Sequence, residues 1–365
     1  MNKKKPPFPE LQYCVRCCLP ETVEGITFDE RGVCSGCNSA EQKMHINWKE
    51  REQQLREKLQ YYKERAGDNY HCIVPISGGK DSCFQLYVLT QIYGLRPLAV
   101  TFSHNWYTET GKHNLKMTLE AFDVDHIMFT PKRSLVNRLA RKSLTSIGDA
   151  CWHCHSGVGA FPLRMALLYD IKLLVWGESA AENGTKADYF NPVKYDENYF
   201  LKISSKVDVA SMADDDIAPE ELNVFKLPSA KEMSAAGIEG IHLGDYIFWD
   251  DERHVDFIKN NFDWREDTVE GTYKGYKSVE CIMAGMHDYL KYLKRGFGRA
   301  TDHATRDVRA GIISREEGFE LVHEHDSKRP ECMNKYMELT GWTEERIHEE
   351  IKKLRKGPCT KIDPK

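Results

Sequence analysis

Long apolar runs are missing from this sequence of 365 residues. Its most apolar stretch, residues 161–176, is interrupted by Arg164, Asp170 and Lys172, whereas a membrane-spanning helix needs about 20 predominantly apolar residues in a row. The first ten residues contain lysines but no apolar segment of the kind that directs secretion. The sequence therefore excludes a membrane span and predicts a cytoplasmic protein.

A surplus of positive charge is missing as well. The 51 Lys and Arg residues face 56 Asp and Glu residues, which gives a net charge of −5. Proteins that bind nucleic acid over an extended surface normally carry a clear excess of Lys and Arg, so nucleic acid is not an expected partner. Hydrophobic residues make up 41% and charged residues 29% of the chain, as in an ordinary folded protein.

Cysteine, in contrast, is abundant. Four of the twelve cysteines form two C-x-x-C pairs, Cys14/Cys17 and Cys34/Cys37, with 16 residues between the pairs. Two such pairs can complete a tetrahedral thiolate shell for Zn²⁺. Residues 1–38 are too short to form a hydrophobic core of their own. We therefore interpret them as a zinc-ribbon-like element with a structural metal rather than as a segment of core thiols.

The pattern of charged and apolar residues divides the rest of the chain into a linker and further domains. Residues 39–66 are charged and lack Pro and Gly, which predicts one long solvated helix, and we assign residues 39–67 to a linker. From residue 68, short apolar runs alternate with helical segments, as in a doubly wound parallel α/β sheet of the Rossmann-like type. The expected strands are residues 71–76, 97–102, 125–130 and 172–177, and the expected helices are residues 81–93, 112–122, 134–144 and 159–169.

We assign residues 68–240 to this α/β domain and residues 241–365 to a helical region that binds substrate or a partner. Within the α/β domain, residues 178–240 show no readable pattern of elements. In the C-terminal region, Ser314 and Glu317 form a capping box that opens a helix, and residues 343–356 predict another.

The strongest local motif follows the first expected strand and opens a helix. It consists of Ser77, Gly78, Gly79, Lys80, Asp81 and Ser82. Two glycines allow a tight turn and a close approach to an oxyanion, and the helix N-terminus supplies free N–H groups. The spacing fits neither a Walker A loop nor a dinucleotide-binding loop. We interpret the motif as a phosphate-binding loop; the alternative is a Gly-Gly turn that only joins strand to helix.

Two further groups of side chains lie where ligand-binding residues are expected. Gly177 and Glu178 directly follow a later strand, where a turn with a solvated Glu is the alternative. Cys151 and Cys154 form a third C-x-x-C pair ahead of another helix. This pair is open to three interpretations: a metal or iron–sulfur half-site completed by Cys281, His153 or His155, a redox or persulfide-carrying pair, or ordinary loop thiols.

Residues 286–311 contain a mixture of arginines and aspartates. The arginines are Arg295, Arg299, Arg306 and Arg309, and the aspartates are Asp288, Asp302 and Asp307. Arginine suits bidentate capture of phosphate or carboxylate, and the Gly-Phe-Gly-Arg turn at residues 296–299 can aim a guanidinium at an anion. The alternative is a solvated helix pair held by intrahelical ion pairs.

These motifs resemble known families. Ser77–Ser82 is similar to the loop of the pyrophosphate-loop (PP-loop) ATP pyrophosphatases, which include NAD and GMP synthetases and tRNA thiolases. The chain also resembles the N-acetyl sugar amidotransferases of lipopolysaccharide and flagellin-sugar synthesis. The resemblance rests on an ordered set of motifs: the four cysteines, this loop, the 151/154 pair, Gly177-Glu178, residues 242–251 and residues 296–311. That family converts an acetamido group into an acetamidino group, and the resemblance covers nearly the whole chain.

The resemblance implies ATP and Mg²⁺ as cofactors and a nucleotide-linked N-acetyl sugar as substrate. Residues 77–82, Gly177 and Glu178 would then bind ATP, with Lys80 as the phosphate cation and Asp81 binding Mg²⁺ or ordering the loop. Arg299, Asp302 and Arg309 are the candidate substrate contacts. No cysteine lies in a glutaminase setting, so ammonia is expected from a separate subunit. The resemblance implies that this supply consists of a glutaminase and a cyclase-like partner. A tRNA thiolase is the alternative enzyme, and a non-enzymatic interaction module is a third interpretation.

Overall fold

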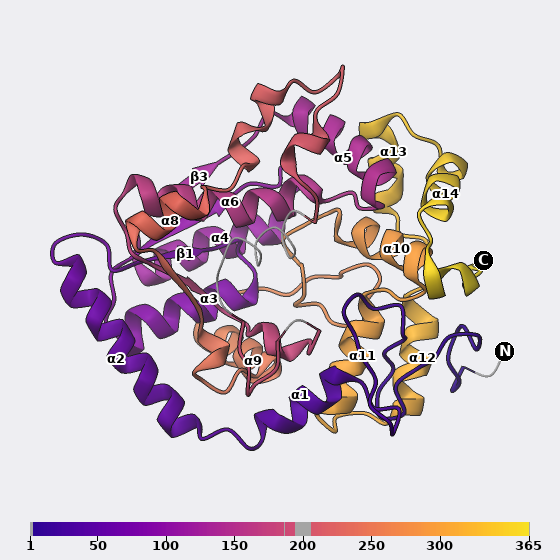
Figure 1. The fold of residues 1–365 in the computed structure, drawn as a ribbon, viewed down its shortest axis with the longest axis horizontal. Helices are drawn as coiled ribbons and strands as arrows, with labels where there is room; N and C mark the ends of the chain where they lie inside the picture. The colour runs from indigo at the N-terminus through magenta and orange to yellow at the C-terminus, as the bar shows by residue number, and fades with distance from the viewer. Residues whose placement is uncertain (1–2, 186, 194–205, 365) are drawn as a thin grey trace.

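A five-stranded parallel sheet forms the centre of the computed structural model, which describes residues 3–185, 187–193 and 206–364 (Figure 1). The strand order is β3-β2-β1-β4-β5. The strands are β1 Cys72–Pro75, β2 Pro97–Phe102, β3 His126–Phe129, β4 Leu173–Trp176 and β5 Glu239–His242. In register, Ile73 of β1 lies opposite Leu98 of β2 and Leu174 of β4. The four strands expected from the sequence are confirmed, and β5 is additional.

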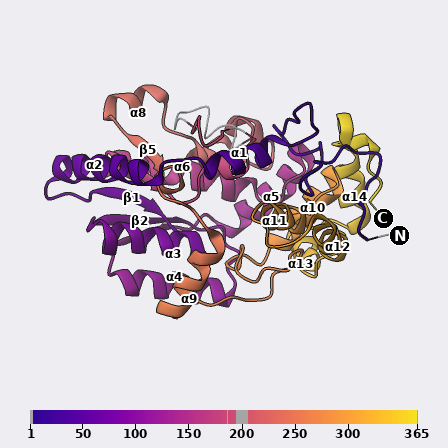
Figure 2. The ribbon, with the colours of Figure 1, turned by 90° about the horizontal axis from the view of Figure 1, so that it is seen from below.

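Helices cover both faces of the sheet because successive strand residues point to opposite sides. Val74 packs into a core with α3 (Lys80–Tyr87), α4 (Glu109–Phe122) and α9 (Asp251–Asn261), whereas Ile73 packs into a second core with α5 (Arg133–Ile147) and α6 (Trp152–Leu168). Figure 2 shows α3, α4 and α9 on one side of β1 and β2, and α6 on the other. The expected doubly wound α/β architecture is thus confirmed.

The single helix predicted over residues 39–66 is wrong. The chain forms α1 (Ser35–Lys43) and α2 (Trp48–Ala66) instead. Asn47 starts the second helix, since its side chain accepts a hydrogen bond from the Glu50 N–H at 3.3 Å. The Trp48 indole donates to the Lys43 carbonyl at 3.0 Å, which satisfies the end of α1. The helix cap at Asn47 therefore separates two helices, although the composition of residues 39–66 favours a continuous one.

Two other helices differ from expectation at their ends. The helix expected at residues 81–93 is α3, which ends at Tyr87 and continues as a π-helical turn, η1, over Val88–Ile92. Helix α6 begins at Trp152 rather than at residue 159, so Cys154 lies in its first turn and not in a loop.

In the segment without a readable pattern, the described residues form short elements. These are η2 Ala180–Glu182, η4 Val209–Met212, η5 Pro219–Phe225 and α8 Ala230–Ala236, followed by β5 and η6 Leu243–Asp245. Residue 186 and residues 194–205 lie outside the described residues.

The C-terminal region is helical, as expected. Besides α9, which packs on the sheet, its helices are α10 Ala284–Arg295, α11 Arg299–Arg309, α12 Arg315–His325, α13 Cys332–Thr340 and α14 Glu344–Lys353, and η7 follows at Gly357–Lys361. The capping box between Ser314 and Glu317 is present, and Gly296, with φ of 77°, ends α10. These helices gather at one end of the sheet beside the N-terminal segment (Figure 1). Phe8 and Leu11 share a hydrophobic core with them.

Within the described residues, no helix combines the length and apolar character needed to cross a membrane.

Candidate functional site

The loop of residues 77–82 lies at the point where the chain direction across the sheet reverses. It follows β1, and Gly177 and Glu178 follow the neighbouring strand β4. From β1 the chain continues to β2 and β3 on one side and later returns to β4 and β5 on the other. In open α/β sheets, ligands bind in the crevice outside the carboxyl ends of the strands at such a switch point.

Gly78 gives the loop its tight turn. Its φ is +88°, and a Cβ there would lie 2.7 Å from the Gly111 carbonyl oxygen and 2.8 Å from the Leu115 nitrogen. A side chain is therefore excluded by conformation and by space. Gly79 precedes α3 without any side-chain cap, which leaves backbone N–H groups of the first helical turn available for an anion.

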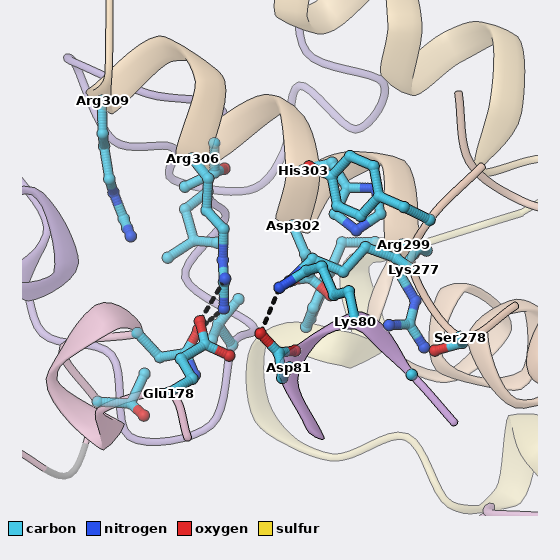
Figure 3. Close-up of a pocket in the computed structure, with 18 of the residues that line it drawn as sticks. Lys80, Asp81, Glu178, Lys277, Ser278, Arg299, Asp302, His303, Arg306 and Arg309 are labelled. Atoms are coloured by element: carbon cyan, nitrogen blue, oxygen red, sulfur yellow. Dashed lines mark hydrogen bonds and ion pairs between the residues drawn. The ribbon is translucent and has the colours of Figure 1, made fainter. Parts of the chain in front are cut away.

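A cavity of about 530 Å³ opens over this loop. Its lining includes Ser77, Gly79, Lys80, Asp81 and Ser82 from the loop, Glu178 and Asn183 after β4, Lys277, Ser278 and Glu280 from the segment before α10, and Arg299, Asp302, His303, Arg306 and Arg309 from α11. Figure 3 shows the α11 side chains projecting from one helix toward Lys80, Asp81 and Glu178. Their spacing at three to four residues places them on one face of α11.

Lys80 is buried at the floor of this cavity and pairs with two carboxylates. Its Nζ contacts Asp81 and lies 2.6 Å from Asp251 Oδ1. Burial alone would lower the pKa of Lys80, but the charges of Asp81 and Asp251 raise it above its ordinary value. Lys80 is therefore a fixed cation beside the loop.

Asp251, at the start of α9, forms ion pairs with three cationic side chains. Besides Lys80, it binds Lys277 Nζ at 2.5 Å and Arg306 Nη1 at 3.1 Å. Burial opposes its ionisation, but these neighbours hold the pKa of Asp251 well below its usual range. Burial and repulsion by Lys80 lower the pKa of Lys277. Such a cluster can rearrange around a polyphosphate, because an incoming anion competes with Asp251 for the same cations.

Glu178 also contacts this cluster. It forms an ion pair with Arg306, whose second terminal nitrogen lies 3.2 Å from Asn183 Oδ1 (Figure 3). Gly177 has a steric role, since a Cβ there would lie 3.0 Å from the Trp249 ring. Of the two predicted strand-end residues, Glu178 therefore lines the cavity, whereas Gly177 packs against Trp249.

The three predicted substrate contacts line the cavity, but each has a protein partner. Arg299 Nε lies 2.6 Å from Asp288 Oδ2, and Asp302 Oδ2 lies 2.5 Å from Lys291 Nζ. Arg309 donates to the Glu182 carbonyl at 3.3 Å and lies 3.4 Å from Cys34 Sγ. Burial would lower the pKa of Arg309, but the neighbouring cysteine thiolates raise it.

The four N-terminal cysteines converge, and their geometry fits a metal ion. Their sulfur atoms lie within 4.8 Å of one another, with Cys14 Sγ 3.8 Å from Cys37 Sγ and Cys17 Sγ 3.7 Å from Cys34 Sγ. In a tetrahedral Zn²⁺ site with Zn–S bonds of about 2.3 Å, ligand sulfurs lie about 3.8 Å apart.

The four-cysteine cluster packs against α11 and α12. Arg315 Nε donates to the carbonyls of Cys14 and Cys17 at 3.1 and 3.0 Å. A Cβ on Gly36 would collide with the Arg309 guanidinium. The cluster thus borders the cavity through Arg309.

Cys151, Cys154 and Cys281 lie in or against one hydrophobic cluster. Among the described residues, however, the groups whose ligand atoms all lie within 4.8 Å are the four N-terminal cysteines and the set Asp149, His155 and His287. Burial raises the pKa of Cys281 to about 12, and burial also raises the pKa values of Cys151 and Cys154. The metal or iron–sulfur, redox and plain-thiol interpretations of this pair all stay predictions.

Sequence reasoning missed several residues that line the cavity or pair with its lining residues. Asp251 ends the 242–251 stretch, but no motif gives it a role, and Arg306 is not one of the three predicted substrate contacts. Lys277 and Glu280 belong to no recognised motif. Burial raises the pKa of Glu280, and its Oε2 has no hydrogen-bond partner within the described ranges. These residues can be recognised as neighbours only in the folded structure, since 170 residues of sequence separate Asp251 from Lys80.

Comparisons with known proteins find the following similarities. Residues 270–359 match the family described as "LPS biosynthesis protein WbpG-like, C-terminal domain". Protein MJ1599 of Methanocaldococcus jannaschii, described as uncharacterized, is 28% identical over 297 residues, covering 81% of this chain and 87% of that protein. NMN synthetase from Francisella tularensis matches with a TM-score of 0.27 and 16% identity, covering 59% of this chain and 87% of that one. The segment matched to the WbpG-like domain includes Lys277, Glu280 and the whole of α11.

Proposed function

We propose that this protein is an ATP-dependent amidotransferase that converts the acetamido group of a nucleotide-linked N-acetyl sugar into an acetamidino group. One observation carries the proposal. The phosphate-type loop Ser77–Ser82 lines one wall of the cavity. Lys277 and the α11 side chains line the other wall, and they belong to the segment that is similar to a lipopolysaccharide-biosynthesis domain. That a loop of the phosphate-binding type and a segment similar to a lipopolysaccharide-biosynthesis domain line one cavity supports the proposal.

The residues suit adenylation of an amide oxygen. The carbonyl oxygen attacks the α-phosphorus of ATP and pyrophosphate leaves, so that the amide becomes an O-adenylated imidate. Ammonia then attacks the former carbonyl carbon, AMP leaves with the oxygen, and loss of a proton gives the amidine. Lys80 and the free N–H groups of α3 would hold the departing pyrophosphate, and Lys277 and Arg306 would neutralise charge once an anion displaces Asp251.

Mg²⁺ fits this site through Asp81, whose carboxylate is more than one-third exposed and lines the cavity. When bound, the ion would supply charge neutralisation on the phosphates. Glu280 would accept a proton from the attacking ammonia: its carboxylate lines the cavity and lies 3.5 Å from Ser77 Oγ, and burial raises its pKa.

The test incubates the full chain with ATP, Mg²⁺, isotopically labelled ammonium and a panel of UDP-N-acetyl sugars. Mass spectrometry should show one sugar in which labelled NH replaces the amide oxygen, with equal amounts of AMP and pyrophosphate. The Lys80→Ala variant is the matched control for contaminating activity. ADP formation, or AMP formation that no sugar stimulates, would contradict the proposal. Adenylation of tRNA in place of a sugar would favour the thiolase.

A further inference from the structure

A second group of ligand-type side chains converges outside the phosphate-loop cavity. Asp149 follows α5, His155 lies in the first turn of α6, and His287 lies in the first turn of α10. All their ligand atoms lie within 4.8 Å of one another. His155 Nδ1 is 3.5 Å from Asp149 Oδ2, and His287 Nε2 is 3.9 Å from Asp149 Oδ1. We propose that these three residues bind a divalent first-row transition metal ion.

The distances suit such an ion. With metal–nitrogen and metal–oxygen bonds of about 2.1 Å, ligand atoms in a tetrahedral shell lie about 3.4 Å apart, so a small inward shift closes the site. Two imidazoles and one carboxylate are a donor set typical of Zn²⁺ and of non-haem Fe²⁺. Hard ions such as Ca²⁺ prefer an all-oxygen shell and are not expected here.

The surrounding hydrogen bonds orient these ligands. His287 Nδ1 lies 3.2 Å from Asp288 Oδ1, and a metal-binding histidine usually donates its other ring N–H to such a carboxylate. That bond leaves the Nε2 lone pair directed at the Asp149 side. Asp149 is itself fixed, since its Oδ1 accepts the Cys151 N–H at 2.7 Å. Both carboxylates are almost completely buried.

A cavity of about 340 Å³ adjoins the group and is lined by both Asp149 and His287. It provides a path for the ion. Three protein ligands leave at least one coordination position open, as in catalytic rather than structural zinc sites. Lys291, Lys294 and Arg295 also line this cavity, so the open position favours an anionic or neutral ligand.

Lys206 is the competitor for the carboxylate. Its Nζ lies 2.9 Å from Asp149 Oδ2, and its side chain is 37% exposed, so it can leave toward solvent. A metal ion must displace this ammonium group. Replacing Lys206 by Met should therefore tighten metal binding, whereas the same change would only remove an ion pair if the group were purely structural.

The site also connects to the phosphate-loop cavity. Asp288, which binds His287, holds Arg299 through its other oxygen, and Arg299 lines that cavity. A metal ion that fixes His287 would thereby help to position Arg299. The proposed metal site itself does not depend on the proposed reaction, because its test requires no ATP or sugar.

The experiment loads the metal-free full chain with Co²⁺ and counts bound ions by equilibrium dialysis and absorption. Wild type should bind two equivalents, one with thiolate-to-metal charge-transfer bands from the N-terminal cysteines and one without them. His155→Ala and His287→Ala should each weaken the second site at least tenfold and leave the thiolate bands unchanged. Lys206→Met should strengthen the second site about tenfold.

The controls separate this site from the nearby thiols. Two variants serve as controls, His113→Ala and Cys151→Ser/Cys154→Ser. His113 lies on α4 and pairs with Asp263. Both variants should still bind two equivalents of Co²⁺. A second ion that is lost in the cysteine variant but kept in the histidine variants overturns the proposal. Absence of a second ion from both wild type and Lys206→Met overturns it as well.

Discussion

The buried Lys80 and the partly buried Asp251 form an ion pair, with 2.6 Å between Nζ and Oδ1, that joins the phosphate-type loop to the start of α9. Because Asp251 also binds Lys277 and Arg306, one carboxylate holds together three cations from three separate parts of the chain. In the proposed reaction these cations are the groups that receive the ATP phosphates.

Removing Lys80 should stop the reaction without unfolding the protein. In Lys80→Ala, Asp251 keeps Lys277 and Arg306 as partners, so it is not left as an unpaired buried charge. We expect AMP formation to fall by about 10²–10³-fold, as is typical for loss of one preorganised cation at a transition state. Lys112→Ala, which removes an exposed lysine on α4, is the control. Turnover in Lys80→Ala equal to that of the control would remove the loop from the mechanism.

Removing the charge of Asp251 should make the stability of the folded protein depend on added phosphate anions. Asp251→Asn leaves three cations close together, and breaking a buried charge network of this kind costs about 3 kcal/mol. Pyrophosphate or ATP should restore much of this loss, since the added anion replaces the missing carboxylate. Thermal unfolding should thus show a larger upward shift with pyrophosphate than in wild type. Asp250→Asn, which keeps its capping function, should respond like wild type.

The N-terminal cysteines should bind one Zn²⁺ per chain. In Cys34→Ser/Cys37→Ser, half of the thiolate shell is lost, and metal analysis should show one zinc equivalent fewer than in wild type. Cys359→Ser, a thiol in η7 far along the sequence, should keep the metal. Wild-type protein that retains no zinc at these cysteines after mild purification would refute this assignment.

Stability should depend on pH through Asp245. Burial raises the pKa of Asp245 to about 6, against the opposing hydrogen bond from Ser179, whereas an unfolded Asp has a pKa of about 3.9. The folded state thus binds more protons between about pH 4 and 6. This contribution to stability is fully present below about pH 4 and is lost as the pH rises through about 6. The pKa difference corresponds to about 3 kcal/mol.

Urea unfolding between pH 4 and 7 measures this contribution. In Asp245→Asn, stability should decline less with rising pH than in wild type. Asp256→Asn, which changes an exposed carboxylate on α9, should retain the wild-type profile. Equal profiles for wild type and Asp245→Asn would show that Asp245 ionises normally in the folded protein.

The isolated chain should use free ammonium but not glutamine. None of its twelve cysteines lies in the Gly-rich turn that exposes a glutaminase nucleophile. Product should form with ammonium alone, and glutamine should support the reaction only after a separate glutaminase and its cyclase-like partner are added. Release of glutamate by the purified chain, at the rate of product formation, would reveal a second active site.

Local motifs predicted the parts of this molecule that depend on neighbours in sequence. The strand before Ser77, the turn at Gly78 and the four cysteines each have a signature of a few residues, because backbone geometry and metal coordination impose fixed spacings. The break between α1 and α2 was also predictable, since Asn47 followed by Glu50 is a helix-start signal that the charged composition obscured.

The ion cluster around Asp251 could not be predicted in this way. Asp251, Lys277 and Arg306 lie on different elements, and nothing in their spacing distinguishes them from surface charges. They meet because α9 and α11 both pack near the carboxyl end of β1, which is a property of the assembled fold. Asp251 lies 55 residues before Arg306 and 171 residues after Lys80, and proximity across such separations leaves no local periodic signal.

The contact of Arg315 with the carbonyls of Cys14 and Cys17 has a consequence for biosynthesis. The ribosome makes these cysteines first and α12 nearly 300 residues later, an interval of about 15–60 s at ordinary elongation rates of about 5–20 residues per second. During that time the nascent thiols lack the helices that later cover them. An ion captured early would shield them from oxidation, so zinc supply during translation should influence the yield of intact protein.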